Sequence, residues 1–152
     1  MMRVMVVEDE EMIRKGIVMA VDWAALDCIV VGEAANGEQA LAVAEDCQPT
    51  LIITDLKMPK MDGLEMVRRL REAGSRAYVI ILTAYDSFAY AQTAIRLGAA
   101  DFLLKPFHDG DLENAVLALQ KRIAAQTAPQ PEPLPGVKPG PKSRYVREAM
   151  VY

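Results

Sequence analysis

Short runs of consecutive apolar residues recur along the first 125 positions of the chain. Each run is three to five residues long, too short for a helix, and most run without polar interruption. A continuous apolar run of this length predicts a strand that is buried on both faces. The five predicted strands cover residues 4–7, 28–31, 51–53, 79–82 and 101–104.

The segments between these runs place their apolar residues three or four positions apart, which predicts helices. The predicted helices cover residues 12–21, 37–43, 64–70, 87–97 and 112–123. Strands that alternate with helices predict an α/β fold, in which a parallel sheet is covered by helices on both faces. We therefore expect a doubly wound, five-stranded parallel sheet, with any ligand at the carboxyl ends of its strands.

Composition narrows the class of protein. The chain has 152 residues, of which 52% are hydrophobic and 25% charged, as in an ordinary globular protein. The net charge is −4, so the chain as a whole lacks the excess of basic residues that indicates nucleic-acid binding. The two cysteines lack CxxC spacing, so we expect no zinc site and no disulfide framework, and a reducing cytoplasm is the simplest compartment. No apolar run is long enough to span a membrane.

The last 24 residues differ in character from the rest. Six of the nine prolines lie in 129–141, which predicts an extended linker. Residues 129–152 carry four basic and two acidic side chains, whereas residues 1–128 carry 13 basic and 19 acidic ones. Helical spacing returns after the linker, and the chain stops within that segment. We expect a folded domain over 1–125, a Pro-rich linker over 126–141 and the start of a further domain over 142–152.

Polar residues follow four of the predicted strands. These residues are Glu8 and Asp9, Asp55, Thr83, and Lys105. Each alone would fit a solvated loop, a turn, a helix cap or a surface lysine. Since the carboxyl ends of parallel strands meet at one edge of the sheet, we expect all five side chains to converge there. Crowded carboxylates favour a hard divalent cation such as Mg²⁺, and an aspartate beside it can attack phosphorus.

The residues at these strand ends resemble those of response-regulator receiver domains over about residues 3–125. The resemblance rests on Glu8-Asp9, on Asp55 within TDLKMPKMDG, on Thr83-Ala84 and on Lys105-Pro106 within DFLLKPF. It implies the strand order 2-1-3-4-5 and phosphorylation of Asp55 by a partner histidine kinase. It also implies that Mg²⁺ is held by Glu8, Asp9, Asp55 and the backbone carbonyl of Lys57, and that Thr83 and Lys105 bind the phosphoryl group.

The same resemblance implies roles for four further features. Phe102 matches the family's aromatic switch residue, and burial in the core is the alternative explanation for a phenylalanine there. The bond before Pro106 matches one that is typically cis. Lys57 and Tyr85 flank the approach of water to phosphorus and would set the lifetime of the phosphoryl group. A dimer would form through a face made by residues 87–97, 101–104 and 109–123.

Further stretches resemble regulators that carry an AraC-type helix-turn-helix DNA-binding domain. They are DW at 22–23, NGEQAL, TAYDSFAYAQTAIRLGAADFLLKP and the closing RYVREAMVY. This resemblance implies a transcription factor whose DNA-binding domain lies beyond this chain. A stand-alone phosphorelay carrier is the alternative. An aspartyl phosphohydrolase is disfavoured, because the position of its general acid, two residues after the nucleophile, holds Lys57. We therefore expect a phosphoacceptor rather than an enzyme.

Overall fold

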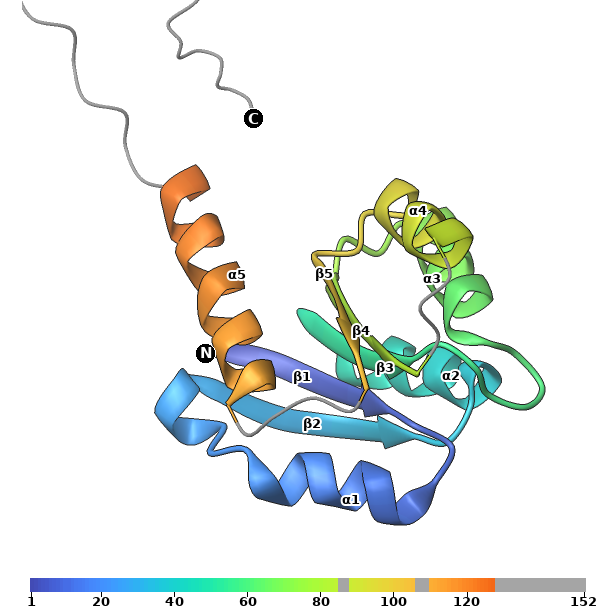
Figure 1. Ribbon diagram of the computed structural model, residues 1–152, viewed down its shortest axis with the longest axis horizontal. Coiled ribbons are helices and arrows are strands. Elements are labelled where there is room, and N and C mark those ends of the chain that lie inside the picture. Colours follow the sequence, from blue (N-terminus) through green and yellow to red (C-terminus); the bar gives the residue numbers. More distant parts are fainter. Residues whose placement is uncertain (85–87, 106–109, 128–152) are drawn as a thin grey trace, which may run out of the picture. The chain divides into compact units, whose positions relative to one another are not determined.

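The computed structural model describes residues 1–84, 88–105 and 110–127, and it divides the chain into two compact units, Met1–Lys121 and Arg122–Tyr152. The fold below is that of the first unit (Figure 1). Its strands are β1 (Met2–Val7), β2 (Cys28–Ala34), β3 (Leu51–Asp55), β4 (Tyr78–Thr83) and β5 (Asp101–Leu104). Its helices are α1 (Glu11–Ala20), α2 (Gly37–Cys47), α3 (Gly63–Glu72) and α4 (Phe88–Arg96), and a 3-10 turn, η1, covers Ala24–Leu26. Helix α5 (Asp111–Thr127) begins in this unit and ends beyond Lys121.

All five strands run parallel in one sheet with the order β2-β1-β3-β4-β5, which confirms the predicted α/β fold. β1 and β3 are neighbours, and Val7 at the end of β1 is in register with Thr54 near the end of β3. On the other side of β3, Asp55 is in register with Leu82 of β4. The carboxyl ends of β1, β3 and β4 therefore lie side by side at one edge of the sheet.

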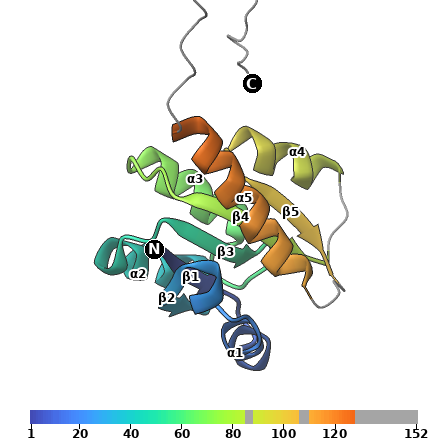
Figure 2. The same ribbon diagram turned by 90° about the vertical axis from the view of Figure 1, so that its left-hand side faces the viewer.

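Helices cover both faces of the sheet (Figure 2). Side chains such as Met5, Ile52 and Ile81 point to one face and pack against α2, α3 and α4. Alternate residues such as Val6 and Ile53 point to the opposite face, where α5 lies. The aliphatic residues of the central strands β1, β3 and β4 are almost fully buried, so each large side chain among them stabilises the fold by roughly 1.5–3 kcal/mol, whereas β2 and β5 at the edges are only partly buried.

Local side chains start and stop the helices that flank the site. The Oδ1 atom of Asn36 accepts a hydrogen bond from the backbone N–H of Gln39 and caps α2. Asp62 caps α3 in the same way, through the N–H of Glu65. Gly98 follows α4 and has a φ of 83°, a left-handed conformation that glycine often adopts where a helix ends.

Some features of the fold are not visible in the hydrophobic pattern. The apolar spacing located α1 correctly, but none of its residues is buried, and the Met12 side chain is 88% exposed. Gly37 is the first residue of α2, where the predicted helix also begins, but a Cβ atom there would collide with the backbone and side chain of Met61. The turn η1 had no signal in the hydrophobic pattern.

Some predictions fall on residues outside the described ranges. These are the role of Tyr85, the cis bond before Pro106, and the linker and further domain beyond Thr127. Within the described residues, no helix is both long and apolar enough to cross a membrane. Cys28 is buried and Cys47 partly buried, and both are free thiols.

Candidate functional site

Three carboxylates from two adjacent strands meet at the carboxyl edge of the sheet. Glu8 and Asp9 follow β1 directly, and Asp55 is the last residue of β3. One carboxylate oxygen from each residue lies within 4.8 Å of the other two. The sequence predicted this convergence, and the register between β1 and β3 is its physical cause.

Glu8 is the buried member of this acidic cluster, with a relative exposure of 2%. Its backbone N–H donates to the carbonyl of Ala34 at 3.0 Å, which continues the pairing of β1 with β2. Its Oε2 atom accepts from the N–H of Glu10 at 3.1 Å, and its Oε1 atom binds the Nζ atom of Lys105 at 3.0 Å. Burial of a carboxylate costs free energy unless its oxygens are hydrogen-bonded, and these partners meet that requirement.

Lys105 follows β5 and reaches across the strand ends to the cluster. Besides Glu8, its Nζ atom binds the Oδ2 atom of Asp55 at 3.4 Å. Burial alone would lower the pKa of Lys105, but the hydrogen bond to Glu8 and the negative charges of Asp55 and Glu8 outweigh that effect, and the pKa is raised. Lys105 is therefore a permanent cation beside the two carboxylates.

Asp9 is exposed, and its pKa lies above the usual value. Partial desolvation is the main cause, followed by the hydrogen bond to Glu8 and the negative charge of Glu8. The raised pKa means that a negative charge on Asp9 costs free energy in this position. A divalent cation among the three carboxylates would relieve that cost, and carboxylate oxygens are the donors that Mg²⁺ prefers. The acidic cluster thus has the chemistry of a magnesium site.

Thr83 and Phe102 lie on the neighbouring strands β4 and β5. Thr83 ends β4, is fully buried, and accepts at its carbonyl oxygen a 2.7 Å hydrogen bond from the N–H of Lys105. Phe102 is partly buried and packs against the core between the sheet and α2, α3 and α4. Its position on β5 is compatible with a role as the switch residue and with a role in the hydrophobic core.

The loop after β3 shapes the surroundings of Asp55. The Oδ1 atom of Asp55 accepts from the N–H of Leu56 at 2.7 Å, so one carboxylate oxygen is oriented by the backbone. At the end of this loop the backbone of Gly63 lies against Asp55 and Leu56, and the N–H of Gly63 donates to the carbonyl of Leu56 at 2.7 Å. A Cβ atom at Gly63 would overlap the carbonyl oxygen of Asp55. The sequence indicated that Asp62-Gly63 shapes the loop, but not this close approach.

Lys57 has a partner that the sequence did not predict. Its Nζ atom lies 5.5 Å from the centre of the Tyr90 ring, within the range of a cation–π interaction. Tyr90 belongs to α4 and is partly buried against the core. The side chain of Lys57 therefore links the loop after Asp55 to α4. The predicted role of its backbone carbonyl as a metal ligand remains a prediction.

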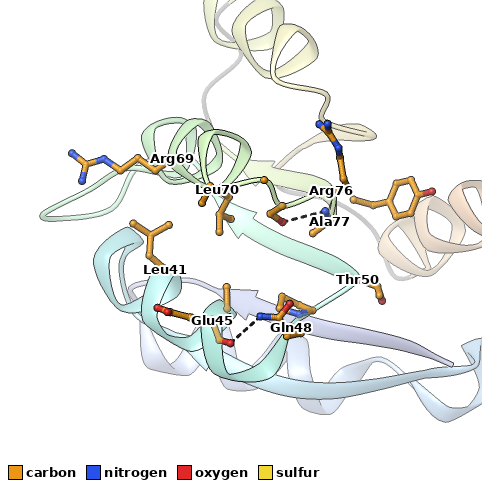
Figure 3. A pocket seen from close by; sticks show the side chains of 14 residues that line it. Leu41, Glu45, Gln48, Thr50, Arg69, Leu70, Arg76 and Ala77 are labelled. Carbon is orange, nitrogen blue, oxygen red and sulfur yellow. Dashed lines mark hydrogen bonds between the residues drawn. The ribbon is translucent and has the colours of Figure 1, made fainter.

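A separate hollow lies at the other edge of the sheet (Figure 3). It has a volume of about 800 Å³ and lies between the C-terminal ends of α2 and α3. Thr50 and Tyr78, which line it, stand where β3 and β4 begin, whereas Asp55 and Thr83 stand where these strands end. The hollow is therefore not part of the acidic cluster.

Comparison with known proteins identifies the family. Residues 4–117 match the response regulator receiver domain, and the chain belongs to that family. It is 38% identical to the REC domain of AraT, a response regulator from Geobacillus stearothermophilus. That similarity covers 82% of this chain and 97% of the other, with a TM-score of 0.75. The strand order and the acidic cluster described above are thus those of a phosphoacceptor-type receiver domain.

Curated relatives are longer than this chain. It is 32% identical over 124 residues to the uncharacterized transcriptional regulatory protein YesN of Bacillus subtilis, covering 82% of this chain and 33% of YesN. It is 36% identical over 113 residues to the nitrate/nitrite response regulator protein NarL of Escherichia coli, covering 74% of this chain and 52% of NarL. The chain thus spans between a third and about half of these relatives.

Proposed function

We propose that this chain receives a phosphoryl group on Asp55 from a sensor histidine kinase, in the presence of Mg²⁺. The observation that carries the proposal is the placement of Asp55 between two further carboxylates and Lys105 at one edge of the sheet. This arrangement brings together a nucleophile and oxygen ligands for a cation within 4.8 Å of one another, and a positive charge that bonds two of the three carboxylates.

The transfer is a displacement at phosphorus. A carboxylate oxygen of Asp55 forms a bond to phosphorus while the bond from phosphorus to the donor nitrogen breaks, and its electron pair stays on the donor imidazole. Mg²⁺, held by Glu8, Asp9, Asp55 and the carbonyl of Lys57, would neutralise charge on the phosphoryl oxygens. Lys105 neutralises further charge, and the hydroxyl of Thr83 donates a hydrogen bond to one oxygen.

The surface beside the site supports a protein phosphodonor. α1 begins at Glu11, two residues after Asp9, and Met12 in its first turn is 88% exposed. Met19, seven residues further along the helix, is 81% exposed. Residues seven apart lie on the same face of a helix, so the two methionines mark an exposed face that runs along α1 from the acidic cluster and that a partner helix could cover.

The chain acts as a phosphoacceptor and not as an enzyme on other substrates. A phosphohydrolase built on Asp55 would need a general acid two residues later, and that position holds Lys57. The ammonium of Lys57 lies against the Tyr90 ring. The chemistry is therefore limited to Mg²⁺-dependent phosphorylation of Asp55 and loss of that phosphoryl group to water.

The output is control of transcription through a DNA-binding domain outside this chain. The names of YesN and of the LuxR-family DNA-binding response regulator from Staphylococcus aureus, 25% identical with a TM-score of 0.69, support it. The AraC type of that domain rests on the sequence resemblance. A stand-alone phosphorelay carrier remains the second candidate. The coding sequence downstream of Tyr152 separates the two, because only the first requires a helix-turn-helix domain there.

A homodimer through α4, β5 and α5 is part of the proposal. Large apolar side chains on all three elements are exposed, namely Ile95 at 69%, Leu104 at 45% and Leu117 at 41%. Phosphorylation would favour the dimer by changing the packing of α4 and β5. Sedimentation of the chain with and without beryllofluoride tests this, and Leu117→Glu should keep the protein monomeric in both states.

The phosphorylation itself is tested with acetyl phosphate as donor. The chain should gain the mass of one phosphoryl group only when Mg²⁺ is present, and Asp55→Ala should abolish the gain. Asp46→Ala, which removes an exposed aspartate from α2, is the matched control and should label normally. Full labelling of Asp55→Ala at one site would overturn the assignment.

A further inference from the structure

Helix α1 is attached to the sheet in part by a charged side chain, beside the partly buried apolar residues Ile17 and Val18. None of its residues is buried, yet the side chain of Arg14 is only 13% exposed. The Nε atom of Arg14 binds Oε1 of Glu33 on β2 at 3.2 Å. Its Nη1 atom donates to the backbone carbonyl of Glu8 at 2.7 Å.

The position of Arg14 in the helix explains this reach. Side chains in a helix lean toward its N-terminus, so Arg14 in the first turns of α1 points back to the loop that precedes the helix. That loop holds Glu8 and Asp9, two of the three carboxylates of the acidic cluster. The planar guanidinium can bond the carbonyl of Glu8 and the carboxylate of Glu33 at once, which a single ammonium group cannot do with the same geometry.

With Arg14 included, every polar group of Glu8 has a partner. The N–H donates to Ala34, the carbonyl accepts from Arg14, and the two carboxylate oxygens accept from Lys105 and from the N–H of Glu10. Three of these partners belong to the strand ends or the loop itself. Arg14 is the one that ties the loop to α1 and, through Glu33, to β2.

We propose that Arg14 is a positioning residue for Mg²⁺ binding, because it fixes the backbone of Glu8 and thereby the Glu8 and Asp9 carboxylates. The inference rests on the proposed function, since it concerns the same metal site. Groups that hold metal ligands in place typically affect metal affinity by about 10–100-fold. Arg14 contacts the backbone of Glu8 and not its carboxylate. We therefore expect that the loss of Arg14 weakens Mg²⁺ affinity by about tenfold, the lower end of that range.

Geometry and charge make opposite predictions for the loss of Arg14. Arg14 is a cation near the cluster, so its charge alone opposes the binding of Mg²⁺, and its removal would tighten binding. Lys15 offers a matched control. It carries the same charge and binds the same Glu33 carboxylate at 3.0 and 3.2 Å, while its bonds among the described residues do not include Glu8. Lys15→Met therefore measures the loss of charge without the loss of positioning.

The experiment is calorimetric titration of the 152-residue chain with Mg²⁺. We expect Lys15→Met to bind Mg²⁺ as tightly as the wild type or slightly more tightly. Arg14→Met should bind it about tenfold more weakly. Arg14→Lys keeps the charge but loses the double contact, and it should fall between wild type and Arg14→Met. Urea unfolding in the absence of Mg²⁺ checks that each variant is folded at the titration temperature.

The outcomes separate this inference from the proposed function. If the wild type binds Mg²⁺ and Arg14→Met binds it as Lys15→Met does, the positioning role is overturned and the metal site stands. If Arg14→Met does not fold, Arg14→Lys decides, and wild-type affinity in that variant overturns the inference. If the wild type binds no Mg²⁺, the metal site of the proposed function fails and this inference fails with it.

Discussion

Gly63 lies so close to Asp55 that a Cβ atom at Gly63 would overlap the backbone carbonyl oxygen of Asp55. The contact joins the first residue of α3 to the last residue of β3 and sets the width of the loop between them. The φ of Gly63 is not positive, so the requirement is for space and not for backbone freedom. Any larger residue must displace the backbone of the proposed phosphoacceptor.

Gly63→Ala should therefore impair both stability and phosphorylation. We expect a loss of about 1–3 kcal/mol in the free energy of unfolding, as in other overpacked sites, and slower labelling of Asp55 by acetyl phosphate. Gly16→Ala is the control. Gly16 lies in α1, and a Cβ atom there would have no neighbouring atom within 4 Å, so alanine should stabilise the chain by about 0.5–1 kcal/mol. Equal stability of the two variants would contradict the crowding argument.

Lys105→Met should destabilise the chain more when Mg²⁺ is absent. The change leaves Glu8, which is 2% exposed, without its cationic partner. Breaking a fully buried ion pair costs roughly 3–5 kcal/mol, and because the Lys105 side chain is 23% exposed we expect a smaller loss, about 2 kcal/mol. Mg²⁺ should recover part of it, since it supplies positive charge to the same carboxylates. Urea unfolding with and without Mg²⁺ measures both effects.

The control for that experiment is Lys121→Met, which removes an exposed lysine from α5. Its effect should stay within about 0.5 kcal/mol, as for most surface substitutions. A loss of stability in Lys105→Met that is no greater than in this control, with or without Mg²⁺, would show that Lys105 does not stabilise the cluster.

The stability of the metal-free chain should depend on the ionisation of Asp9. Its pKa is raised in the folded state, so the folded chain holds this proton more tightly than the unfolded chain does. The contribution of Asp9 to the free energy of unfolding is therefore most favourable at low pH and falls as pH rises from the unfolded pKa through the folded one. Asp9→Asn should remove this fall, so at neutral pH without Mg²⁺ the variant should be more stable than the wild type.

The measurement is urea unfolding of wild type and Asp9→Asn in EDTA across acidic to neutral pH. The difference between the two proteins, rather than either curve alone, isolates Asp9 from the other acids. The variant should also bind Mg²⁺ more weakly, because it loses a charged ligand. A wild type that is the more stable of the two at neutral pH in EDTA would refute the role of carboxylate repulsion.

Phosphorylation should alter the segment from Thr83 to Lys105. We expect the Thr83 hydroxyl to move toward the phosphoryl group and Phe102 to turn into the space it leaves, which changes the packing of α4. α4 is rich in alanine and has few large apolar anchors, so its backbone should respond most. Hydrogen exchange with and without beryllofluoride measures the response. Identical exchange over 84–105 in both states would argue against a switch in this segment.

The lifetime of the phosphoryl group should depend on Lys57. We expect slow loss of phosphate, because neither Lys57 nor Tyr85 carries a carboxylate or amide that could orient an attacking water. The double variant Lys57→Asn, Tyr85→Glu should therefore lose phosphate faster than the wild type. The contact of Lys57 with Tyr90 adds a second expectation: Tyr90→Phe, which keeps the ring, should match the wild type more closely than Tyr90→Leu does.

Decay of the phosphorylated protein, followed by mass spectrometry after removal of the donor, tests both expectations. If the double variant decays no faster than the wild type, water access at these two positions does not set the lifetime. If Tyr90→Phe and Tyr90→Leu decay at the same rate, the ring does not act through Lys57.

The amino-acid sequence by itself determined the elements, the class of fold and the candidate site residues. Apolar runs mark the strands because both faces of a parallel sheet are buried, and the caps at Asn36 and Asp62 could be predicted because a cap acts within three residues of its helix. The convergence of Glu8, Asp9 and Asp55 at one edge could also be predicted, since the carboxyl ends of parallel strands share that edge, and the pairing of β1 with β3 then brings the three carboxylates together.

The tertiary structure decided what depends on contacts between segments distant in sequence. The bond from Lys105 to Glu8 joins residues 97 positions apart, and the place of Arg14 against the Glu8 carbonyl depends on how α1 lies beside β2. The exposure of α1, the crowding at Gly37 and Gly63 and the contact of Lys57 with Tyr90 are of the same kind. Hydrophobic periodicity reports that a face is apolar, but only packing determines which neighbour, if any, covers it.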